Sequence, residues 1–334
     1  MVELSTLIGP PKPLLVNTDM DGIFSALLLT NYWGATVGGF CNSKDRIWVR
    51  NDLRLKDCIA VDMYVASRQV TCIDQHMIAV DKDHAQQIGW SGKVANPNLD
   101  RSKVFDGAYA TKYPLSTAAY LLSLVPVPDE WFNFSGQTPI MPLSEMFYRA
   151  DDILFISRAS SYTKNASDWW QWLEQVAINP KAIAWTKSLI DRVDPSKAAE
   201  IKMRASASLI RDYHCTRPDG GMERVTDDAG TATPDWQRLA YDIAAAAGLK
   251  PLDFSGTYRE WTGDPVRYSA TYEDLHDLKT TGHVRGRRVV SYAFVRGPFS
   301  HANLSVTHAL PTETSPIAAP GTIDPATHSA SGSA

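Results

Sequence analysis

Residues 14–29 read LLVNTDMDGIFSALLL, which predicts a short buried strand, a polar turn and the start of a buried helix. Asp19 and Asp21 stand two residues apart where the strand ends, and Gly22 permits a tight turn directly after them. In an open α/β sheet, ligand sites lie just beyond the carboxyl ends of the strands. We therefore expect both carboxylates to project toward a shared point, an arrangement suited to a divalent metal ion or a phosphoryl group.

The composition is that of a globular protein with a sizeable core. The chain has 334 residues, of which 44% are hydrophobic, enough for two domains. Its formal net charge of -4 argues against a protein that coats nucleic acid non-specifically. The four cysteines show no CxxC spacing and are expected to be buried free thiols. The sequence has no signal-peptide pattern and no apolar run of ~20 residues, so we expect a cytoplasmic protein with no membrane partner.

Two further strand-like segments each end in an aspartate. Residues 57–62 and 69–74 are nearly continuous in apolar and β-branched residues, as is typical of strands covered on both faces. They deliver Asp62 and Asp74 to their carboxyl ends. Together with the first strand, they predict three strands that bring carboxylates to the same edge of one sheet.

The remaining pattern predicts helices, loops and a few later strands. Helices are expected at residues 21–33, 114–124, 142–150, 168–178, 234–247 and 272–278, with Pro180 and Pro195 each opening another. Strands are expected at residues 35–41, 288–295 and 301–307, and a loop-rich stretch runs to about residue 111.

These elements predict an α/β fold in several parts. An N-terminal domain with a mainly parallel sheet is expected over residues 1–156, followed by a helical linker over residues 157–213. Residues 214–310 are expected to form a smaller α+β domain that binds the substrate. The last segment, residues 311–334, is rich in Pro, Thr, Ser and Ala and is expected to be disordered.

The carboxylates and one histidine form a candidate site for two metal ions. Two divalent cations about 3.5–4 Å apart need several hard oxygen ligands, commonly with one bridging carboxylate, to hold an attacking water and a phosphate. Imidazole together with carboxylates suits Mn²⁺, whereas carboxylates alone suit Mg²⁺. The expected cofactors are therefore two Mn²⁺ or Mg²⁺ ions, held by Asp19, Asp21, Asp62, Asp74, Asp151 and His76.

These motifs resemble those of the DHH phosphoesterase superfamily, which includes RecJ-type exonucleases, nano-RNases, enzymes that cleave cyclic dinucleotides and family II pyrophosphatases. The opening motif of that family, His-x-Asp-x-Asp-Gly followed by Ser-Ala, is similar to residues 17–22 with Ser25 and Ala26. Its Asp at a strand end resembles Asp62, and its Asp-His-His is similar to residues 74–76. Its fourth motif, a small residue followed by Asp, resembles Ala150-Asp151. The resemblance covers residues 14–155, whereas the Gly-Gly-Gly-His signature of the family's second domain is not found.

The resemblance implies a role for each matched residue. Asp19, Asp21, Asp62 and Asp151 would ligate the metal ions, with Asp62 bridging, and His76 would face the scissile phosphate. Asp74 would orient its neighbours. Asn17 and Gln75 replace two ligating histidines of the family, and each offers only an uncharged carbonyl oxygen as a weaker ligand.

The resemblance implies hydrolysis of a phosphodiester or phosphoanhydride by water that two metal ions activate. The slightly negative net charge and one compact basic cluster favour a short oligonucleotide or dinucleotide as the substrate. Two alternatives remain open. One is a degenerate site on the same fold that binds a nucleotide without cleaving it. The other is a phosphatase of the haloacid-dehalogenase type, in which Asp19 would be the phosphorylated nucleophile and Asp21 the general acid.

A basic cluster near residue 287 is the candidate contact for substrate phosphate. Arginine offers planar, bidentate donors to phosphate oxygens. The equally weighted alternative is a solvated strand edge that charge protects from pairing. The candidate substrate-binding residues are Arg285, Arg287, Arg288, Arg296 and His301.

Overall fold

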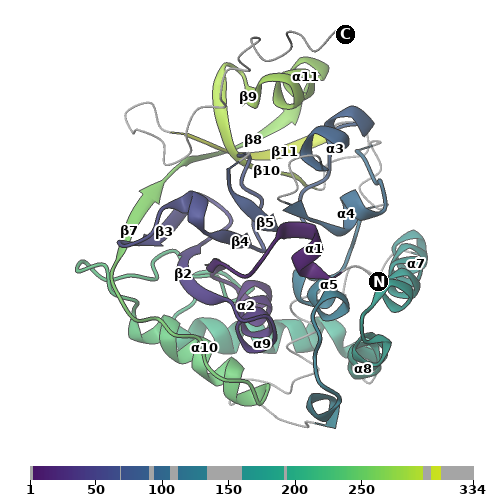
Figure 1. Ribbon diagram of the computed structural model, residues 1–334, viewed down its shortest axis with the longest axis vertical. Helices are drawn as coiled ribbons and strands as arrows, with labels where there is room; N and C mark the ends of the chain where they lie inside the picture. The colour runs from purple at the N-terminus through teal and green to yellow at the C-terminus, as the bar shows by residue number, and fades with distance from the viewer. Residues whose placement is uncertain are drawn as a thin grey trace, which may run out of the picture.

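The computed structural model describes residues 3–67, 69–89, 94–105, 112–133, 160–191, 194–295 and 302–309 (Figure 1). These residues form a mixed α/β fold with a mainly parallel seven-stranded sheet, helices and a second, antiparallel sheet of four strands. The expected α/β class with a mainly parallel sheet is therefore confirmed.

The first sheet contains every strand that ends in a candidate site residue. Its strand order is β6-β5-β4-β1-β2-β3-β7, and the neighbours from β6 to β2 run parallel, whereas β3 and β7 are antiparallel additions. The bounds are β1 Pro13–Asn17, β2 Thr36–Cys41, β3 Arg46–Arg50, β4 Ile59–Val61, β5 Thr71–Ile73, β6 Val94–Ala95 and β7 Tyr258–Thr262. The second sheet has the order β8-β11-β10-β9, with β8 Asp264–Ala270, β9 His283–Val284, β10 Arg287–Val295 and β11 Ala302–His308.

The helices precede, connect and follow the strands. Their bounds are α1 Leu4–Ile8, α2 Met20–Tyr32, α3 Lys82–Gly89, α4 Pro97–Asp100, α5 Thr117–Leu124, α7 Ser160–Val176, α8 Pro180–Asp191, α9 Ala198–Tyr213, α10 Pro234–Ala246 and α11 Tyr272–Thr281. Short 3₁₀ turns cover Leu55–Asp57, Asp129–Asn133 and Pro195–Lys197. No helix within the described ranges combines the length and apolar character that crossing a membrane requires.

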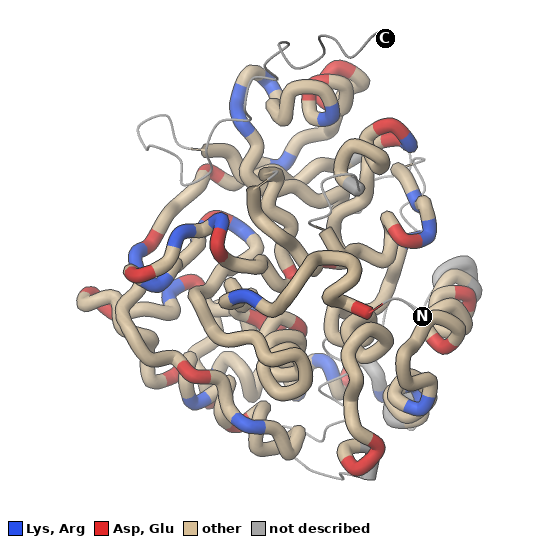
Figure 2. Tube along the Cα trace, viewed as in Figure 1, with Lys and Arg blue, Asp and Glu red and all other residues tan. Residues whose placement is uncertain are grey.

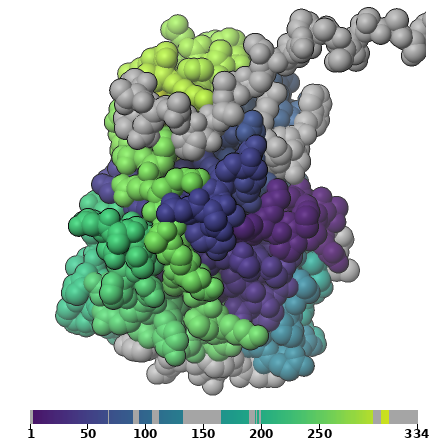
Figure 3. Space-filling model, turned by 60° about the vertical axis from the view of Figure 1, so that its left-hand side comes forward, coloured from purple at the N-terminus to yellow at the C-terminus, as the bar shows by residue number. Residues whose placement is uncertain are grey.

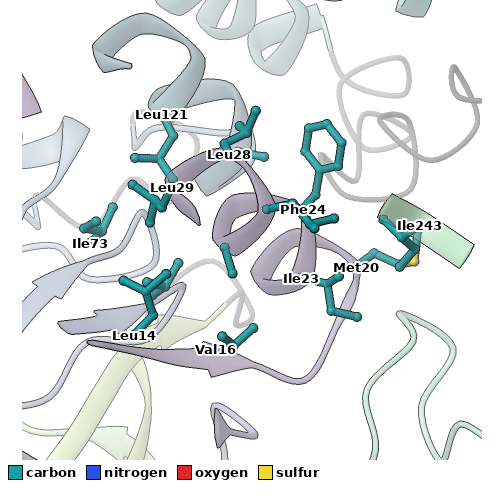
Figure 4. Close-up of a cluster of buried hydrophobic side chains, with 14 of the residues drawn as sticks. Leu14, Val16, Met20, Ile23, Phe24, Leu28, Leu29, Ile73, Leu121 and Ile243 are labelled. Atoms are coloured by element: carbon teal, nitrogen blue, oxygen red, sulfur yellow. The ribbon is translucent and has the colours of Figure 1, made fainter. Parts of the chain in front are cut away.

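One face of the first sheet is covered by α2, α5 and α10. The alternation of side chains along β1 turns Leu14 and Val16 toward this face, where they join Ile23 of α2 in one buried cluster. Figure 4 shows these side chains gathered between β1 and α2, with Leu121 of α5 and Ile243 of α10 completing the cluster. The apolar run after Asp21 thus forms a helix that is buried along almost its whole length.

The second sheet covers the opposite face. Leu15, which alternates away from α2, shares a buried cluster with Val290, Phe294 and Leu304 of β10 and β11. Both faces of the central strands are therefore covered, which explains why those strands read as continuous apolar runs.

Contacts between the second sheet and the first concentrate on loops at the carboxyl ends of the parallel strands. Thr307 donates its hydroxyl to the carbonyl of Lys44, in the loop after β2. The Ala66 amide, after β4, donates to the Val290 carbonyl at 2.7 Å, and the Tyr292 hydroxyl donates to the Ile78 carbonyl, after β5, at 3.3 Å. The second sheet is consequently fixed beside the sheet edge that carries the candidate site.

The path of the chain after α9 returns to the first sheet before it builds the second. Strand β7 pairs antiparallel with β3, with Trp48 opposite Glu260, and α10 packs against α2. Figure 3 shows the green chain before the second sheet lying against the purple and blue N-terminal elements, with the yellow-green second sheet above. Residues 214–262 therefore pair and pack with the first sheet, so the sheets do not divide at the domain boundary expected at residue 213.

Several sequence expectations about single elements were wrong. Strands β3, β7 and β8 were not expected, since each carries charged residues and pairs antiparallel near a sheet edge. Helix α3 lies in the stretch expected to be loop, because few of its residues face the core, among them His84, Ala85 and Ile88. Helix α7 begins at Ser160 rather than near Asp168. The helix expected at residues 142–150 and the tail expected at residues 311–334 lie outside the described residues.

Candidate functional site

The three aspartate-bearing strand ends lie side by side at one level of the sheet. In the parallel register, Val16 of β1 pairs with Val61 of β4, and Val61 pairs with Ile73 of β5. The next residues along these strands are Asn17, Asp62 and Asp74, which therefore follow one another across the carboxyl edge. All three are buried. The expectation that three strands bring carboxylates to one edge is confirmed for β4 and β5, whereas β1 delivers Asn17 at this level and Asp19 two residues further on.

The turn after β1 is shaped by a close approach that only glycine permits. A Cβ atom on Gly22 would lie 2.3 Å from the carbonyl oxygen of Asn17 and 2.5 Å from its Cβ atom. Asp19 caps α2, because its Oδ1 accepts from the Gly22 amide at 3.0 Å. In the Asp-x-Asp-Gly pattern, Gly22 is therefore required by the close approach to Asn17, and the first Asp has a structural role as the helix cap.

Asn17 links two of the carboxylates. Its Nδ2 donates to Asp19 Oδ2 at 2.7 Å and to Asp62 Oδ2 at 2.8 Å, while its Oδ1 accepts from the Thr18 amide at 3.0 Å. The amide nitrogen of Asn17, rather than its oxygen, therefore faces the carboxylates. Asn17, which was expected to be a weak metal ligand, thus holds Asp19 and Asp62 at a fixed separation.

Asp21 faces the N-terminus of α5. Its Oδ2 accepts from the Thr117 amide at 2.8 Å and its Oδ1 from the Ala118 amide at 2.9 Å. These amides are the unpaired donors that open a helix, so a carboxylate there is stabilised by the helix end. Burial nevertheless raises the pKa of Asp21 well above its ordinary value, and the charges of Asp62 and Asp19 raise it further.

Asp62 is the residue on which the contacts converge. Besides the bond from Asn17, its Oδ1 accepts from the Thr117 hydroxyl at 2.7 Å and lies 3.2 Å from His76 Nε2. Its backbone has a φ of 59°, a left-handed conformation that is uncommon for a residue other than glycine. Burial alone would raise the pKa of Asp62, but the charge of His76 and the hydrogen bonds from His76, Asn17 and Thr117 outweigh burial and lower it.

Asp19 is held in a less favourable electrostatic setting. Burial raises its pKa most, and the charges of Asp62 and Asp219 add to that, so that the pKa reaches about 8. Arg217 and the amide of Gly22 oppose the rise. Because the charge of Asp62 raises the pKa of both Asp19 and Asp21, this corner carries more negative charge than its surroundings compensate.

The second half of the site is the segment Asp74-Gln75-His76. Asp74 Oδ2 accepts from the Met77 amide at 2.7 Å, whereas its buried Oδ1 has no hydrogen-bond donor among the described residues. Burial raises the pKa of Asp74. Gln75 is 9% exposed, and its side-chain nitrogen lies 3.1 Å from ring nitrogens of His76.

His76 reaches solvent while it contacts Asp62. Its side chain is 43% exposed. Burial of the ring would lower its pKa, but the charges of Asp62 and Asp74 and the hydrogen bond to Asp62 raise it to about 9. His76 is therefore a cation at neutral pH, with an open side from which it can meet an anion.

Three of the expected residues have the spacing of metal ligands. One ligand atom each from Asp62, Asp74 and His76 lie within 4.8 Å of one another. Asp19 joins this group through Asn17, and Asp21 joins it through Thr117, which contacts both Asp21 and Asp62. The remaining expected ligand, Asp151, lies outside the described residues.

Two of the arginines expected to bind substrate have acidic partners on α11 and on β8 of the second sheet. Arg285 lies 3.3 Å from Asp274 and stacks 4.3 Å above the ring of Tyr268, and Arg287 lies 2.8 Å from Asp264. Among the contacts of the described residues, none joins Arg285 or Arg287 to the carboxylates. Figure 2 shows basic and acidic residues close to one another around the second sheet and α11. Arg288 is partly buried in β10, and Arg296 and His301 lie outside the described residues.

The structure adds three polar residues to the site that the sequence did not identify with it. Thr117 begins α5, and its hydroxyl donates to Asp62. The sequence indicated the start of a helix here, but not that the hydroxyl would contact Asp62. Lys112 is buried, and its charge acts on His76. Arg217 lies 3.7 Å from Asp19, nearly two hundred residues later in the chain, and no local pattern indicates that contact.

Comparison with models of protein families, with curated proteins and with solved structures found no match for this chain.

Proposed function

We propose that this protein is a metal-dependent phosphoesterase that hydrolyses a phosphodiester in a short oligonucleotide or dinucleotide. The observation that carries the proposal is the convergence of Asn17, Asp62 and Asp74 at one level of a parallel sheet, with His76 beside them. Ligand sites of open α/β sheets lie at this edge. The order of the motifs along the chain, which resembles that of the DHH superfamily, supports the same proposal.

The donor set fits divalent cations. The charge of Asp62 raises the pKa of both Asp19 and Asp21, and Asp74 leaves one buried oxygen without a donor among the described residues. A cation would relieve both conditions, because it compensates the charge and supplies the missing partner. Oxygen ligands with one imidazole are a set that suits Mn²⁺ or Mg²⁺.

The proposed ligands are Asp19, Asp62, Asp74 and His76, with Asp21 close by. When bound, two such ions would neutralise phosphate charge and make water a stronger nucleophile. Asn17 keeps Asp19 and Asp62 at a fixed separation, and Thr117 orients Asp62. His76, a cation with an exposed side, would donate to a phosphate oxygen unless it serves as a ligand. We further propose that the second sheet, fixed beside this edge, forms one wall of the substrate site.

One observation favours a second candidate, a degenerate site that binds a nucleotide without cleaving it. The Asn17 amide donates to Asp19 and Asp62, so it satisfies part of their hydrogen-bonding capacity without a metal ion. The haloacid-dehalogenase alternative has less support, because both carboxylate oxygens of Asp19 already accept hydrogen bonds, one from Gly22 and one from Asn17.

Hydrolysis by the purified chain tests the proposal directly. A generic phosphodiester, short oligonucleotides and cyclic dinucleotides would be offered with Mn²⁺ or Mg²⁺. Asp62→Asn is expected to lower turnover by at least about a hundredfold, since it removes the carboxylate on which the site converges. Asp57→Asn is the matched control, because Asp57 makes its ion pair with Arg54, away from the site. The protein could show no turnover with either metal and still bind nucleotide after Asp62→Asn. That result would reject the enzyme and favour the second candidate, a site that binds a nucleotide without cleaving it.

A further inference from the structure

A loop from the second half of the chain is fastened onto the acidic turn after β1. Residues 216–222, the Arg217 loop, follow α9 and close on themselves, with the Thr216 and Arg217 amides each donating to the Gly221 carbonyl at 3.0 Å. The Met20 amide donates to the Asp219 carbonyl at 3.2 Å. The Thr18 hydroxyl donates to the Met222 carbonyl at 3.3 Å. The loop is thus built against the residues on either side of Asp19.

The guanidinium group of Arg217 is held in place from two sides. Its Nη1 donates to the Asn42 carbonyl, at the end of β2, over 3.2 Å, and its Nε lies 3.3 Å from Asp219 Oδ1. The group also lies directly over Gly221, where a Cβ atom would come within 2.0 Å of Nε and 2.2 Å of Nη2. The lack of a side chain at Gly221 therefore makes room for the guanidinium.

The third nitrogen of the guanidinium, Nη2, is aimed at the site but has no acceptor. It is buried, and among the described residues no oxygen lies in hydrogen-bonding geometry with it. Its separation from Asp19 Oδ2 is 3.7 Å, too long for a hydrogen bond. A buried, charged donor that lacks a partner is costly, so a position of this kind is unusual unless a ligand completes it.

We propose that Arg217 binds the substrate's phosphate, with Nη2 donating to a non-bridging oxygen. The inference rests on the proposed phosphoesterase function and names a residue that neither the motifs nor the basic cluster of the second sheet supplies. Arginine suits this task because its planar donors match phosphate oxygens and its charge does not titrate. The row Asp19–Asn17–Asp62 then has Arg217, a permanent cation, beside Asp19 at one end and His76 beside Asp62 at the other.

Two substitutions remove this contact by different routes. Arg217→Gln removes the charge and the donor fork. Gly221→Ala keeps Arg217 but places a methyl group where the guanidinium lies, so the flexible end of Arg217 must move away. Arg224→Gln is the matched control, because this exposed arginine of the same segment makes its ion pair with Asp228 rather than with the site.

Binding of inorganic phosphate to the full chain in the presence of Mn²⁺, followed by calorimetry, is the test. Arg217→Gln and Gly221→Ala are both expected to weaken phosphate binding by at least about tenfold, with Arg217→Lys intermediate and Arg224→Gln unchanged. Mn²⁺ affinity is expected not to fall, because Arg217 is a cation beside Asp19. With a hydrolysable phosphodiester, KM should rise in the same order.

Two results would overturn the inference. One is a failure of the phosphate assay to depend on Arg217: either both variants bind phosphate as tightly as the unaltered chain does, or the unaltered chain does not bind phosphate. The other is a parallel loss of Mn²⁺ and phosphate binding, which would make Arg217 a support for Asp19 alone. The chain could bind phosphate through Arg217 and yet hydrolyse none of the substrates. That result would support the role of Arg217 and reject the proposed phosphoesterase activity, so failure of the inference can be told apart from failure of the proposed function.

Discussion

The side-chain amide of Asn17 donates to Asp62 over 2.8 Å and so joins the ends of β1 and β4, 45 residues apart in the chain. The same nitrogen donates to Asp19 over 2.7 Å. Two carboxylates that would otherwise only repel each other therefore share one neutral donor group.

Removal of this donor is expected to destabilise the metal-free protein. Asn17→Ala removes the hydrogen bond to the Oδ2 atoms of Asp19 and Asp62, while their Oδ1 atoms keep the donors Gly22 and Thr117. The loss should cost about 1–3 kcal/mol of unfolding free energy. Urea denaturation measures the loss, and added Mn²⁺ should restore more stability in the variant than in the unaltered chain. Asn31→Ala is the control, since Asn31 lies on α2 and donates only to backbone carbonyls and to Thr30 at the surface. Equal losses for the two variants would contradict the role given to Asn17.

The hydroxyl of Thr117 is expected to matter for activity more than a buried hydroxyl elsewhere in the same helix. Thr117→Val keeps the shape but removes the donor to Asp62, leaving that carboxylate with fewer partners. We expect turnover to fall by about tenfold or more, with a loss of stability of about 1–3 kcal/mol. Ser123→Ala removes another buried hydroxyl of α5, which bonds only the Tyr120 carbonyl, and should leave turnover unchanged. A Thr117→Val variant with normal kinetics would show that Asp62 needs no orientation from α5.

Uptake of metal ions is expected to release protons. Because burial and neighbouring carboxylates raise the pKa of Asp19 to about 8, Asp19 is mostly protonated at neutral pH in the metal-free protein. The affinity for Mn²⁺ should therefore rise as pH increases toward about 8, by up to about tenfold per pH unit. Calorimetry in buffers of different ionisation enthalpy counts the protons, and Asp19→Asn should reduce both the count and the slope. An affinity for Mn²⁺ that is independent of pH would show that Asp19 does not bind the metal ion.

Acid stability is expected to depend on His84, which lies on the buried side of α3. Burial lowers the pKa of His84 from its ordinary 6.5 to about 4, and its Nδ1 accepts from the Val80 amide. The folded chain thus binds this proton less readily than the unfolded chain. Stability is full above about pH 6.5 and falls as pH drops toward about 4, by up to about 3 kcal/mol. Denaturation at a series of pH values should show a smaller loss for His84→Gln, whereas His276→Gln, an exposed histidine of α11, should show the full loss.

The sequence predicted the fold and the positions of the candidate site residues correctly wherever the pattern that determines them lies within a few consecutive residues. The apolar run and Gly22 predicted the strand, the tight turn and the helix that follows, because each depends on residues within one turn of the chain. The ends of β4 and β5 were predicted for the same reason, and their alignment followed from the parallel sheet. Asp62 and Asp74 were placed correctly at one edge on this basis.

The sequence was insufficient where a residue's role depends on a distant partner. Arg285 and Arg287 carry the charge expected of a phosphate site, but in the folded chain Asp274 of α11 and Asp264 of β8 already lie beside them. Arg217 gave no signal, since its position beside Asp19 exists only after the loop that follows α9 has packed on the first turn of α2. Strand β7 is similar, because its pairing with β3 joins segments from opposite ends of the chain.

The return of β7 to the first sheet has a consequence for synthesis of the protein on the ribosome. A nascent chain holds β1, β4 and β5, with their aspartates, early in translation. It has neither the Arg217 loop nor the strand that covers the edge of β3 until residue 262 has emerged. The carboxylates are therefore assembled before the segments that complete them, and a chain halted before that residue exposes an unpaired strand edge to its neighbours.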